Sequence, residues 1–242
     1  MVSKIQQSEP GDWSNTVTGV GLGRKLYTYE RGGKLYSTSA KHGSWKELGE
    51  GYKTKLLLAD GTEDGNLFAI EENGNLYKVD PASGEWEQIG DDGAWSDTVA
   101  GDAVSGVIYT VESDGQLWKT DTEEGESESI GSDFDTQALW AWQGKIYLLE
   151  NNGDLYVIDP ETGEFAQHGA DGAYGDTVTA AVHDGVLYAV EDDGALGATV
   201  LDGGAYTEHD DEDFSEVRHL FSAAGSLYAI ENDGTLYKVA VD

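Results

Sequence analysis

Short segments in which apolar and polar residues alternate recur along the whole chain, and turns rich in Gly, Asn and Asp separate them. One stretch contains four such segments in a row, at residues 56–59, 66–70, 75–80 and 85–89. Alternation with a period of two is typical of a β-strand that is buried on one face. The pattern therefore predicts short strands that are grouped in fours.

The group of four strands is an internal repeat. An aromatic residue on the second predicted strand returns every 38 to 41 residues, at Tyr27, Phe68, Tyr109, Tyr147, Tyr188 and Tyr228. A leucine on the third predicted strand keeps the same spacing, at Leu35, Leu76, Leu117, Leu155, Leu196 and Leu236. Four strands in about 40 residues are the signature of a β-propeller blade. The repeats predict an all-β, six-bladed β-propeller with four antiparallel strands per blade.

The boundaries follow from the repeat. We expect one domain over residues 1–242, with units at 11–51, 52–93, 94–133, 134–172, 173–213 and, for the sixth, 214–242 together with 1–10. A stack of β-solenoid coils is the alternative, but it would need shorter repeats without tight hairpins. Within each unit, a pair such as Asn73-Gly74 predicts a type I′ hairpin between the second and third strands, because both central residues of that turn need positive φ.

The two ends of the chain predict ring closure. The last unit stops after its third strand, so its outermost strand is missing. Residues 4–7 precede Gly11-Asp12-Trp13 just as residues 86–89 precede Gly93-Ala94-Trp95. We therefore expect the N-terminal segment to pair with the C-terminal blade.

The charge balance excludes several classes of partner. The 47 acidic and 14 basic residues give a net charge of -33, which repels nucleic acids and anionic membrane surfaces. The 7 Trp, 13 Tyr and 5 Phe argue against disorder, and zero Cys exclude thiolate chemistry. Without an apolar leader or spanning segment, we expect a soluble monomer, either extracellular or in the cytoplasm of a salt-rich environment. The acidic surface predicts a halophile-like protein whose folding strengthens with salt.

A repeated acid follows each anchor aromatic by three residues. The series is Glu30, Glu71, Glu112, Glu150, Glu191 and Glu231. Each carboxylate ends the second strand, where it could accept hydrogen bonds around the turn. The alternative is a ring of ligand or cation contacts.

Aromatic residues in the loops between units form a second candidate set. The residues are Trp13, Trp95, Tyr174 and Phe214, with Asp97 and Asp176 close behind two of the rings. A flat ring beside carboxylates and hydroxyls suits a sugar, and we take this set as the candidate ligand-binding residues. The competing interpretation is that the rings fill gaps between blades. We also expect Trp45 and Trp86, on outer strands, to pack between blades.

Two short motifs carry a family resemblance. The layout Gly93-Ala94-Trp95-Ser96, then Gly106 to Tyr109, then Leu117-Trp118-Lys119, resembles the repeats of tachylectin and tectonin-type lectin propellers. The resemblance implies binding of amino sugars or related glycans at pockets between blades. The repeats here are shorter and more numerous, so no particular contact is carried over. Segments 74–84 and 153–163 also look like the Gly-x-Leu-Tyr repeats of many bacterial propellers.

Enzyme chemistry has little support in the sequence. A sialidase needs an arginine cluster, yet the chain has only Arg24, Arg31 and Arg218. Asp60, Asp102 and Asp184 lack a dedicated calcium-binding spacing, and no His-Glu-x-x-His pair exists for zinc. The acidic run at 208–213 fits a solvated loop better than a cation site. We expect no catalytic residues and no organic cofactor, whereas a calcium ion or another cation stays open.

These observations favour a non-catalytic binding module. Carbohydrate is the first ligand class, bound through the loops between blades. The alternative is a protein–protein interaction scaffold, and a third option is an engineered or environmental propeller without an assigned ligand. A metal-dependent hydrolase ranks below all three.

Overall fold

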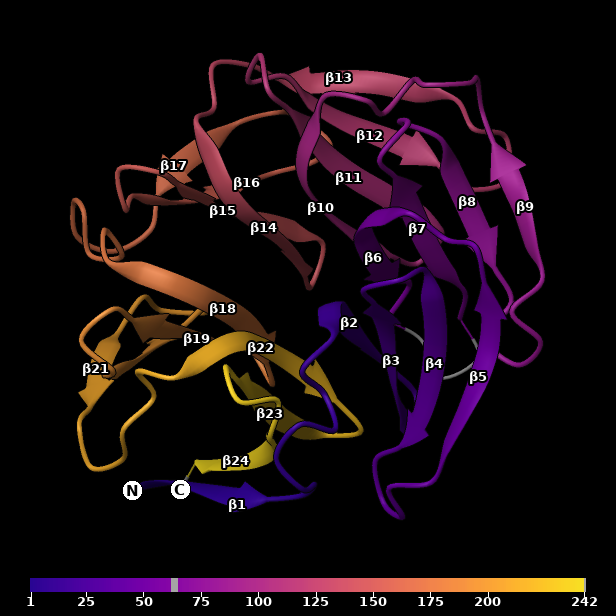
Figure 1. Cartoon of the computed structure of the whole chain (residues 1–242). Coiled ribbons are helices and arrows are strands. Elements are labelled where there is room, and N and C mark those ends of the chain that lie inside the picture. Colours follow the sequence, from indigo (N-terminus) through magenta and orange to yellow (C-terminus); the bar gives the residue numbers. More distant parts are fainter. Residues whose placement is uncertain (62–64, 242) are drawn as a thin grey trace.

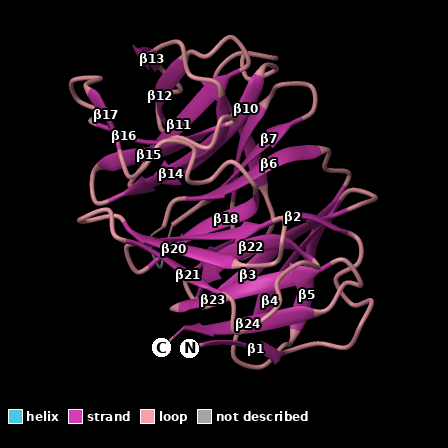
Figure 2. Cartoon of the chain, turned by 90° about the vertical axis from the view of Figure 1, so that its left-hand side faces the viewer, coloured by secondary structure: helices cyan, strands magenta, loops and turns pink. Residues whose placement is uncertain are grey.

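The chain forms six four-stranded antiparallel sheets that are arranged around a ring (Figure 1). A computed structural model describes residues 1–61 and 65–241; residues 62–64 of the second unit and Asp242 at the end of the sixth lie outside the described part. Figure 2 shows strands and loops throughout, and the described residues include no helix that could span a membrane. The prediction of a six-bladed propeller is confirmed.

Each of the first three blades uses four consecutive strands. The first contains β2 (Thr16–Leu22), β3 (Lys25–Glu30), β4 (Lys34–Ser39) and β5 (Trp45–Glu50). The second contains β6 (Thr54–Ala59), β7 (Leu67–Glu71), β8 (Leu76–Val79) and β9 (Trp86–Ile89). The third contains β10 (Thr98–Val104), β11 (Val107–Glu112), β12 (Leu117–Asp121) and β13 (Ser127–Gly131). In each blade the first strand is innermost and the fourth is outermost.

The remaining blades repeat this order with one exception. The fourth contains β14 (Thr136–Trp142), β15 (Lys145–Glu150), β16 (Leu155–Ile158) and β17 (Phe165–Gln167). The fifth contains β18 (Thr177–His183), β19 (Val186–Glu191), β20 (Leu196–Val200) and β21 (Tyr206–His209). The sixth contains β22 (Val217–Ala223), β23 (Ser226–Glu231), β24 (Leu236–Val241) and, as its outermost strand, β1 (Val2–Gln6).

The N-terminal strand closes the ring, as predicted. β1 pairs antiparallel with β24, with Val2 opposite Val241 and Gln6 opposite Tyr237. The two termini consequently lie side by side in Figure 1. The first and last strands of the chain therefore belong to one sheet.

Alternating side chains of each strand pack against the two neighbouring blades. On β7, Leu67 and Ala69 belong to a cluster with residues of the first blade, whereas Phe68 and Ile70 belong to a cluster with residues of the third. Successive residues of a strand point to opposite faces of its sheet, which produces this division. The hydrophobic core is consequently a series of interblade layers.

A glycine in each hairpin joins that blade to the next loop. The carbonyl of this glycine accepts a hydrogen bond of 2.9 to 3.2 Å from the amide of the loop aromatic; the glycine and aromatic pairs are Gly33 and Tyr52, Gly74 and Trp95, Gly115 and Phe134, Gly153 and Tyr174, Gly194 and Phe214, and Gly234 and Trp13. A Cβ atom on Gly74 would lie only 2.4 Å from the amide nitrogen of Ser96. Hairpins and interblade loops therefore share one face of the ring, and the contact between them requires glycine.

The hairpins differ from the predicted type I′ turn. Gly74 has a φ of 80°, but Asn73 is not among the described residues with positive φ. The Gly74 amide donates to the Glu71 carbonyl, and the Glu71 amide donates to the Asn75 carbonyl, so the loop has three residues and ends on a left-handed glycine. The Asn73 side chain instead accepts a hydrogen bond of 3.0 Å from the Asn75 amide. The type I′ prediction was wrong because a side chain that can cap the turn favours the longer loop.

Trp45 and Trp86 do not pack between blades. Their exposed fractions are 69% and 59%, because each lies on an outermost strand that no further strand covers. Each indole packs edge-on against a tyrosine of the neighbouring strand, with ring centroids 5.6 Å apart for Tyr36 and Trp45 and 4.7 Å apart for Tyr77 and Trp86. The predicted interblade packing of these two residues was wrong.

Candidate functional site

The repeated glutamates lie on the hairpin face, and a threonine on the innermost strand donates to four of them. The Oγ1 to carboxylate distances are 2.8 Å for Thr16 and Glu30, 3.2 Å for Thr54 and Glu71, 2.8 Å for Thr98 and Glu112, and 3.5 Å for Thr177 and Glu191. Glu150 accepts from the Asp135 amide at 3.4 Å. These bonds tie the second strand to the start of the first strand, or to the residue just before it, in the first five blades. They give the glutamate a structural role there without a ligand.

The sequence contained a signal for these partners that the sequence analysis did not use. A threonine follows the loop aromatic by two or three residues at Thr16, Thr54, Thr98, Thr136 and Thr177. Val217 takes its place in the sixth blade, where Glu231 pairs instead with the ammonium of Lys4 at 2.5 Å. Thr136 of the fourth blade has the expected position, but its hydroxyl has no partner among the described residues. The donor to the glutamate therefore differs between blades.

Burial raises the pKa of several of these carboxyl groups. Desolvation raises the pKa of Glu30, Glu71 and Glu112, and their hydrogen bonds partly oppose it. Glu191 shifts furthest, to a pKa of about 7, because its burial is joined by repulsion from nearby aspartates, the largest contribution coming from Asp176. Its Oε1 atom is buried and has no partner within the described chain.

The four candidate aromatic residues of the loops are buried between blades. Trp13, Trp95, Tyr174 and Phe214 have exposed fractions of 9%, 4%, 2% and 0%. Each belongs to an interblade cluster, for example Trp13 with Leu26 and Leu236. The candidate acids Asp97 and Asp176 are exposed, so rings and acids do not form one continuous surface. Two of the rings nevertheless line cavities.

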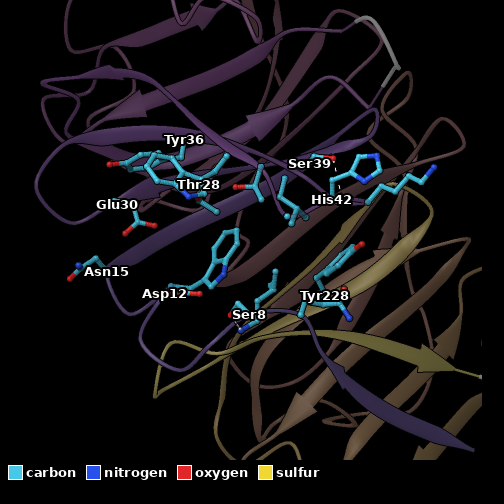
Figure 3. A pocket seen from close by; sticks show the side chains of 18 residues that line it. Ser8, Asp12, Asn15, Thr28, Glu30, Tyr36, Ser39, His42 and Tyr228 are labelled. Atoms are coloured by element: carbon cyan, nitrogen blue, oxygen red, sulfur yellow. Dashed lines mark hydrogen bonds between the residues drawn. The ribbon is translucent and has the colours of Figure 1, made fainter.

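The larger cavity lies between the sixth and first blades and has a volume of about 670 Å³. Figure 3 shows Glu30, Asn15, Asp12 and Tyr36 toward one end and Ser39 and His42 toward the other. Trp13 and the exposed Trp45 also line it. The cavity thus presents aromatic surface together with hydroxyl, amide and carboxylate groups.

The turn between the third and fourth strands explains why this junction is open. A Cβ atom on Gly84, Gly125 or Gly163 would lie 2.4 to 3.1 Å from the outermost strand of the preceding blade, whereas one on the equivalent Gly43 would meet nothing within 4 Å. Gln7 corresponds in the repeat to Ile89, which is buried at the junction of the second and third blades. The Gln7 side-chain amide instead donates to the Ile5 and Gln6 carbonyls. A polar residue at one repeat position leaves the space unfilled.

A smaller cavity of about 330 Å³ lies on the hairpin face of the third blade. Its lining includes Trp95, Trp118, Glu112, Asp97 and Asp114. Trp95 and Asp97 are the members of the candidate set that the structure brings to one cavity. This cavity is therefore aromatic and acidic.

The innermost strands carry titratable groups that do not converge. Asp102 is desolvated, which raises its pKa to about 6, although it accepts hydrogen bonds of 2.9 and 2.8 Å from the Ala103 and Ala141 amides. Burial lowers the pKa of His219 to about 4. Within residues 1–61 and 65–241, no three His, Asp or Glu side chains gather as metal ligands would. Asp60, Asp102 and Asp184 are accordingly not gathered into such a group in that part of the chain.

Comparisons place the chain among known propellers. A family model described as outer membrane protein assembly factor BamB matches residues 6–242. A solved structure of a protein of unknown function from Bacteroides thetaiotaomicron VPI-5482 is similar with a TM-score of 0.72 at 15% identity, covering 99% of this chain and 76% of the other. BamB from Moraxella catarrhalis is similar with a TM-score of 0.55 at 13% identity, covering 92% and 71% of the two chains. No curated protein matches significantly. At these identities the solved structures show the fold alone.

Proposed function

This chain belongs to the family described as outer membrane protein assembly factor BamB, and from that premise we propose that its propeller is a non-catalytic scaffold that binds other proteins. An assembly factor acts on other proteins, and on a propeller such contacts are made by sites on its surface. The partner surface would be basic, because the chain carries a net charge of -33.

A band of exposed aromatic side chains on the outermost strands carries this proposal. Four of these strands present a ring at the same register position, with exposed fractions of 43% to 69%; the residues are Trp45, Trp86, Phe165 and Tyr206. Aromatic residues are enriched at protein interfaces, where they bury a large area at a small cost in entropy. We name these four residues the rim aromatics.

The rim aromatics also flank unpaired strand edges. The outer edge of each blade hydrogen-bonds to no other strand in the part of the chain that is described. An extended segment of a partner can add to such an edge through main-chain hydrogen bonds, while side chains provide specificity. A basic, extended segment would satisfy the edge, the rings and the charge together.

Peptide binding tests the scaffold proposal. The probe is a short extended peptide with lysine at alternate positions, and its counterpart carries glutamate at those positions. We expect the basic peptide to bind at low salt and the triple variant Trp45→Ser, Trp86→Ser, Phe165→Ser to bind it at least about tenfold more weakly. Val178→Ser is the control, because Val178 is exposed but lies on an innermost strand. Equal binding of both peptides, or no effect of the triple variant, would contradict the proposal.

The large cavity favours carbohydrate binding as a second candidate function. It combines Trp13, Tyr36 and Trp45 with hydroxyl and amide side chains, and its volume suits a small saccharide. A glycan array at low and high salt tests this candidate. Binding that Trp45→Ala abolishes and Trp86→Ala preserves would support it, and the absence of any hit under both conditions would remove it.

A further inference from the structure

Lys4 occupies a defined cage in the sixth blade. Its ammonium lies 2.5 Å from the carboxylate of Glu231 and 5.2 and 5.4 Å from the ring centroids of Phe214 and Tyr237. It also donates to the Asp213 carbonyl. Both partners of the ion pair are mostly buried, with side-chain exposures of 12% and 13%. A carboxylate and two aromatic faces together stabilise an ammonium group.

The third blade carries the same three groups at corresponding positions. Glu112 pairs across its sheet with the first residue of the innermost strand, as Glu231 does. Trp118 follows the buried leucine of the third strand, as Tyr237 does, and Trp95 is the loop aromatic that corresponds to Phe214. All three residues of the third blade line the cavity of about 330 Å³.

The residue that fills the cage differs between the two blades. Lys4 lies opposite Val239 in the sixth blade, and Ser127 lies opposite Thr120 at the same register position in the third. The first, second, fourth and fifth blades place their rim aromatics at this position. Ser127 is too short to reach the rings, and its hydroxyl bonds with Thr120 at 2.8 Å. The cavity lies at the place that the Lys4 side chain fills in the sixth blade.

We propose that the cavity of the third blade binds a lysine side chain of the partner protein, held as Lys4 is held in the sixth blade. The proposal rests on the scaffold function and names the group that this part of the surface recognises. The ammonium would approach Glu112 between the Trp95 and Trp118 rings, and the two exposed acids Asp97 and Asp114 at the cavity would draw it in.

The charged lining distinguishes a lysine from a neutral ligand. The charged residues that line the cavity are Glu112, Asp97 and Asp114, all of them acidic. Thr98 donates one hydrogen bond to Glu112 at 2.8 Å, so the other carboxylate oxygen stays available. Lys55 compensates the charge of Glu112 only in part. A neutral sugar would add nothing to that compensation, whereas an ammonium group would.

Two probes that differ at one amino group test the proposal. They are a short peptide with one central lysine and the same peptide with that lysine Nε-acetylated. Binding is followed by NMR through the indole N–H signals of the 7 Trp. We expect the lysine peptide to shift the signals of Trp95 and Trp118 saturably, and the acetylated peptide to bind at least about tenfold more weakly.

Two variants make the test specific. Ser127→Lys supplies the missing ammonium from within, so we expect it to weaken binding of the lysine peptide at least about tenfold. Ser132→Lys adds the same charge at an exposed residue that is not part of the cavity lining, and should bind nearly as the unaltered protein does. Equal binding of both peptides, or unchanged binding by Ser127→Lys, would overturn the proposal. The rim aromatics do not line this cavity, so this result is separate from their failure in the scaffold test.

Discussion

The sixth and third blades share one arrangement of side chains, which is filled in the sixth blade and open in the third. Both set a glutamate, a loop aromatic and a third-strand aromatic around one point, but only the sixth blade places a cation there. That cation comes from β1, the strand that closes the ring. In the sixth blade the cage therefore stabilises closure, and in the third the same groups stay accessible. We infer from the comparison that the same three groups stabilise the ring where Lys4 lies between them, and can bind a ligand where Ser127 takes the place of the lysine.

Removal of the closing strand should have the largest effect. Deletion of residues 1–9 exposes the edge of β24, removes Val2 from the core and leaves Glu231 without its ion pair. We expect a loss of about 4 kcal/mol or more in the free energy of unfolding. Urea unfolding measures it. An unchanged urea midpoint would show that closure by β1 does not stabilise the ring.

Loss of the internal cation alone should come next. Lys4→Met keeps the strand but leaves a mostly buried carboxylate unpaired, and we expect a cost of about 3 kcal/mol. Lys34→Met is the matched control, because the Lys34 and Glu47 pair is exposed to solvent, with side-chain exposures of 43% and 37%, and should contribute far less to stability. Similar costs for the two variants, measured by urea unfolding, would show that the cage adds nothing to an ordinary surface pair.

The fifth blade offers a glutamate with neither a near cation nor a short hydrogen bond. Burial raises the pKa of Glu191 from 4.5 to about 7, so the unfolded chain releases this proton first as pH rises. Its contribution to stability is therefore greatest below pH 4.5 and falls between pH 4.5 and about 7. Between about pH 5 and about pH 8, the unaltered protein should lose about 2 kcal/mol more of its free energy of unfolding than the Glu191→Gln variant does.

Urea unfolding at these two pH values measures the difference. Glu87→Gln, at an exposed glutamate of an outermost strand, should leave the pH dependence as it is. Equal pH dependence in the unaltered protein and Glu191→Gln would contradict the assigned role of Glu191.

The donor to the third-blade glutamate gives a smaller effect. Thr98→Val copies Val217 of the sixth blade and removes the 2.8 Å hydrogen bond to Glu112, which should cost about 1 kcal/mol. Thr136→Val is the control, because the Thr136 hydroxyl is buried without a partner among the described residues, and its loss should cost nothing measurable. Thermal unfolding of both variants decides, and a larger cost for Thr136→Val would reverse the assignment.

Filling the third cage should have the smallest effect on stability. Ser127→Lys places an ammonium beside Glu112 and the two indoles, and we expect a gain of about 0.5 kcal/mol. Ser132→Lys relieves the same net charge without the cage, so the difference between the two variants isolates the local contribution. A loss of stability in Ser127→Lys relative to Ser132→Lys would mean that the cage does not accept a lysine from this strand.

The sequence predicted the parts that repetition determines. The spacing of the Tyr27 and Leu35 series predicted blades, strand order and ring closure, because every blade must solve the same packing problem. The hairpin type was wrong because Asn73 caps its own turn. Trp45 and Trp86 were misplaced because alternation does not distinguish an interblade face from an uncovered outer strand.

The candidate site was less predictable than the fold. The candidate aromatics proved to be interblade residues, and only Trp95 and Asp97 share a cavity lining. The correspondence of Lys4 with Ser127 depends on the register of two strand pairs, β1 with β24 and β12 with β13. The first pair joins the two ends of the chain, so its register cannot be read from neighbouring residues in the sequence. Repeat spacing identifies the positions at which all blades carry the same kind of residue. Cross-strand register is needed to find a position at which one blade carries a different one.

Exchange of the two cage residues tests the central claim most directly. The double variant Lys4→Ser, Ser127→Lys should move the cation from the sixth blade to the third and leave the sixth cage open. Titration with the lysine peptide, followed by NMR, should then leave the Trp95 and Trp118 signals unshifted and shift those of Phe214 and Tyr237 instead. Continued shifts at Trp95 and Trp118, with none at Phe214 and Tyr237, would contradict the account.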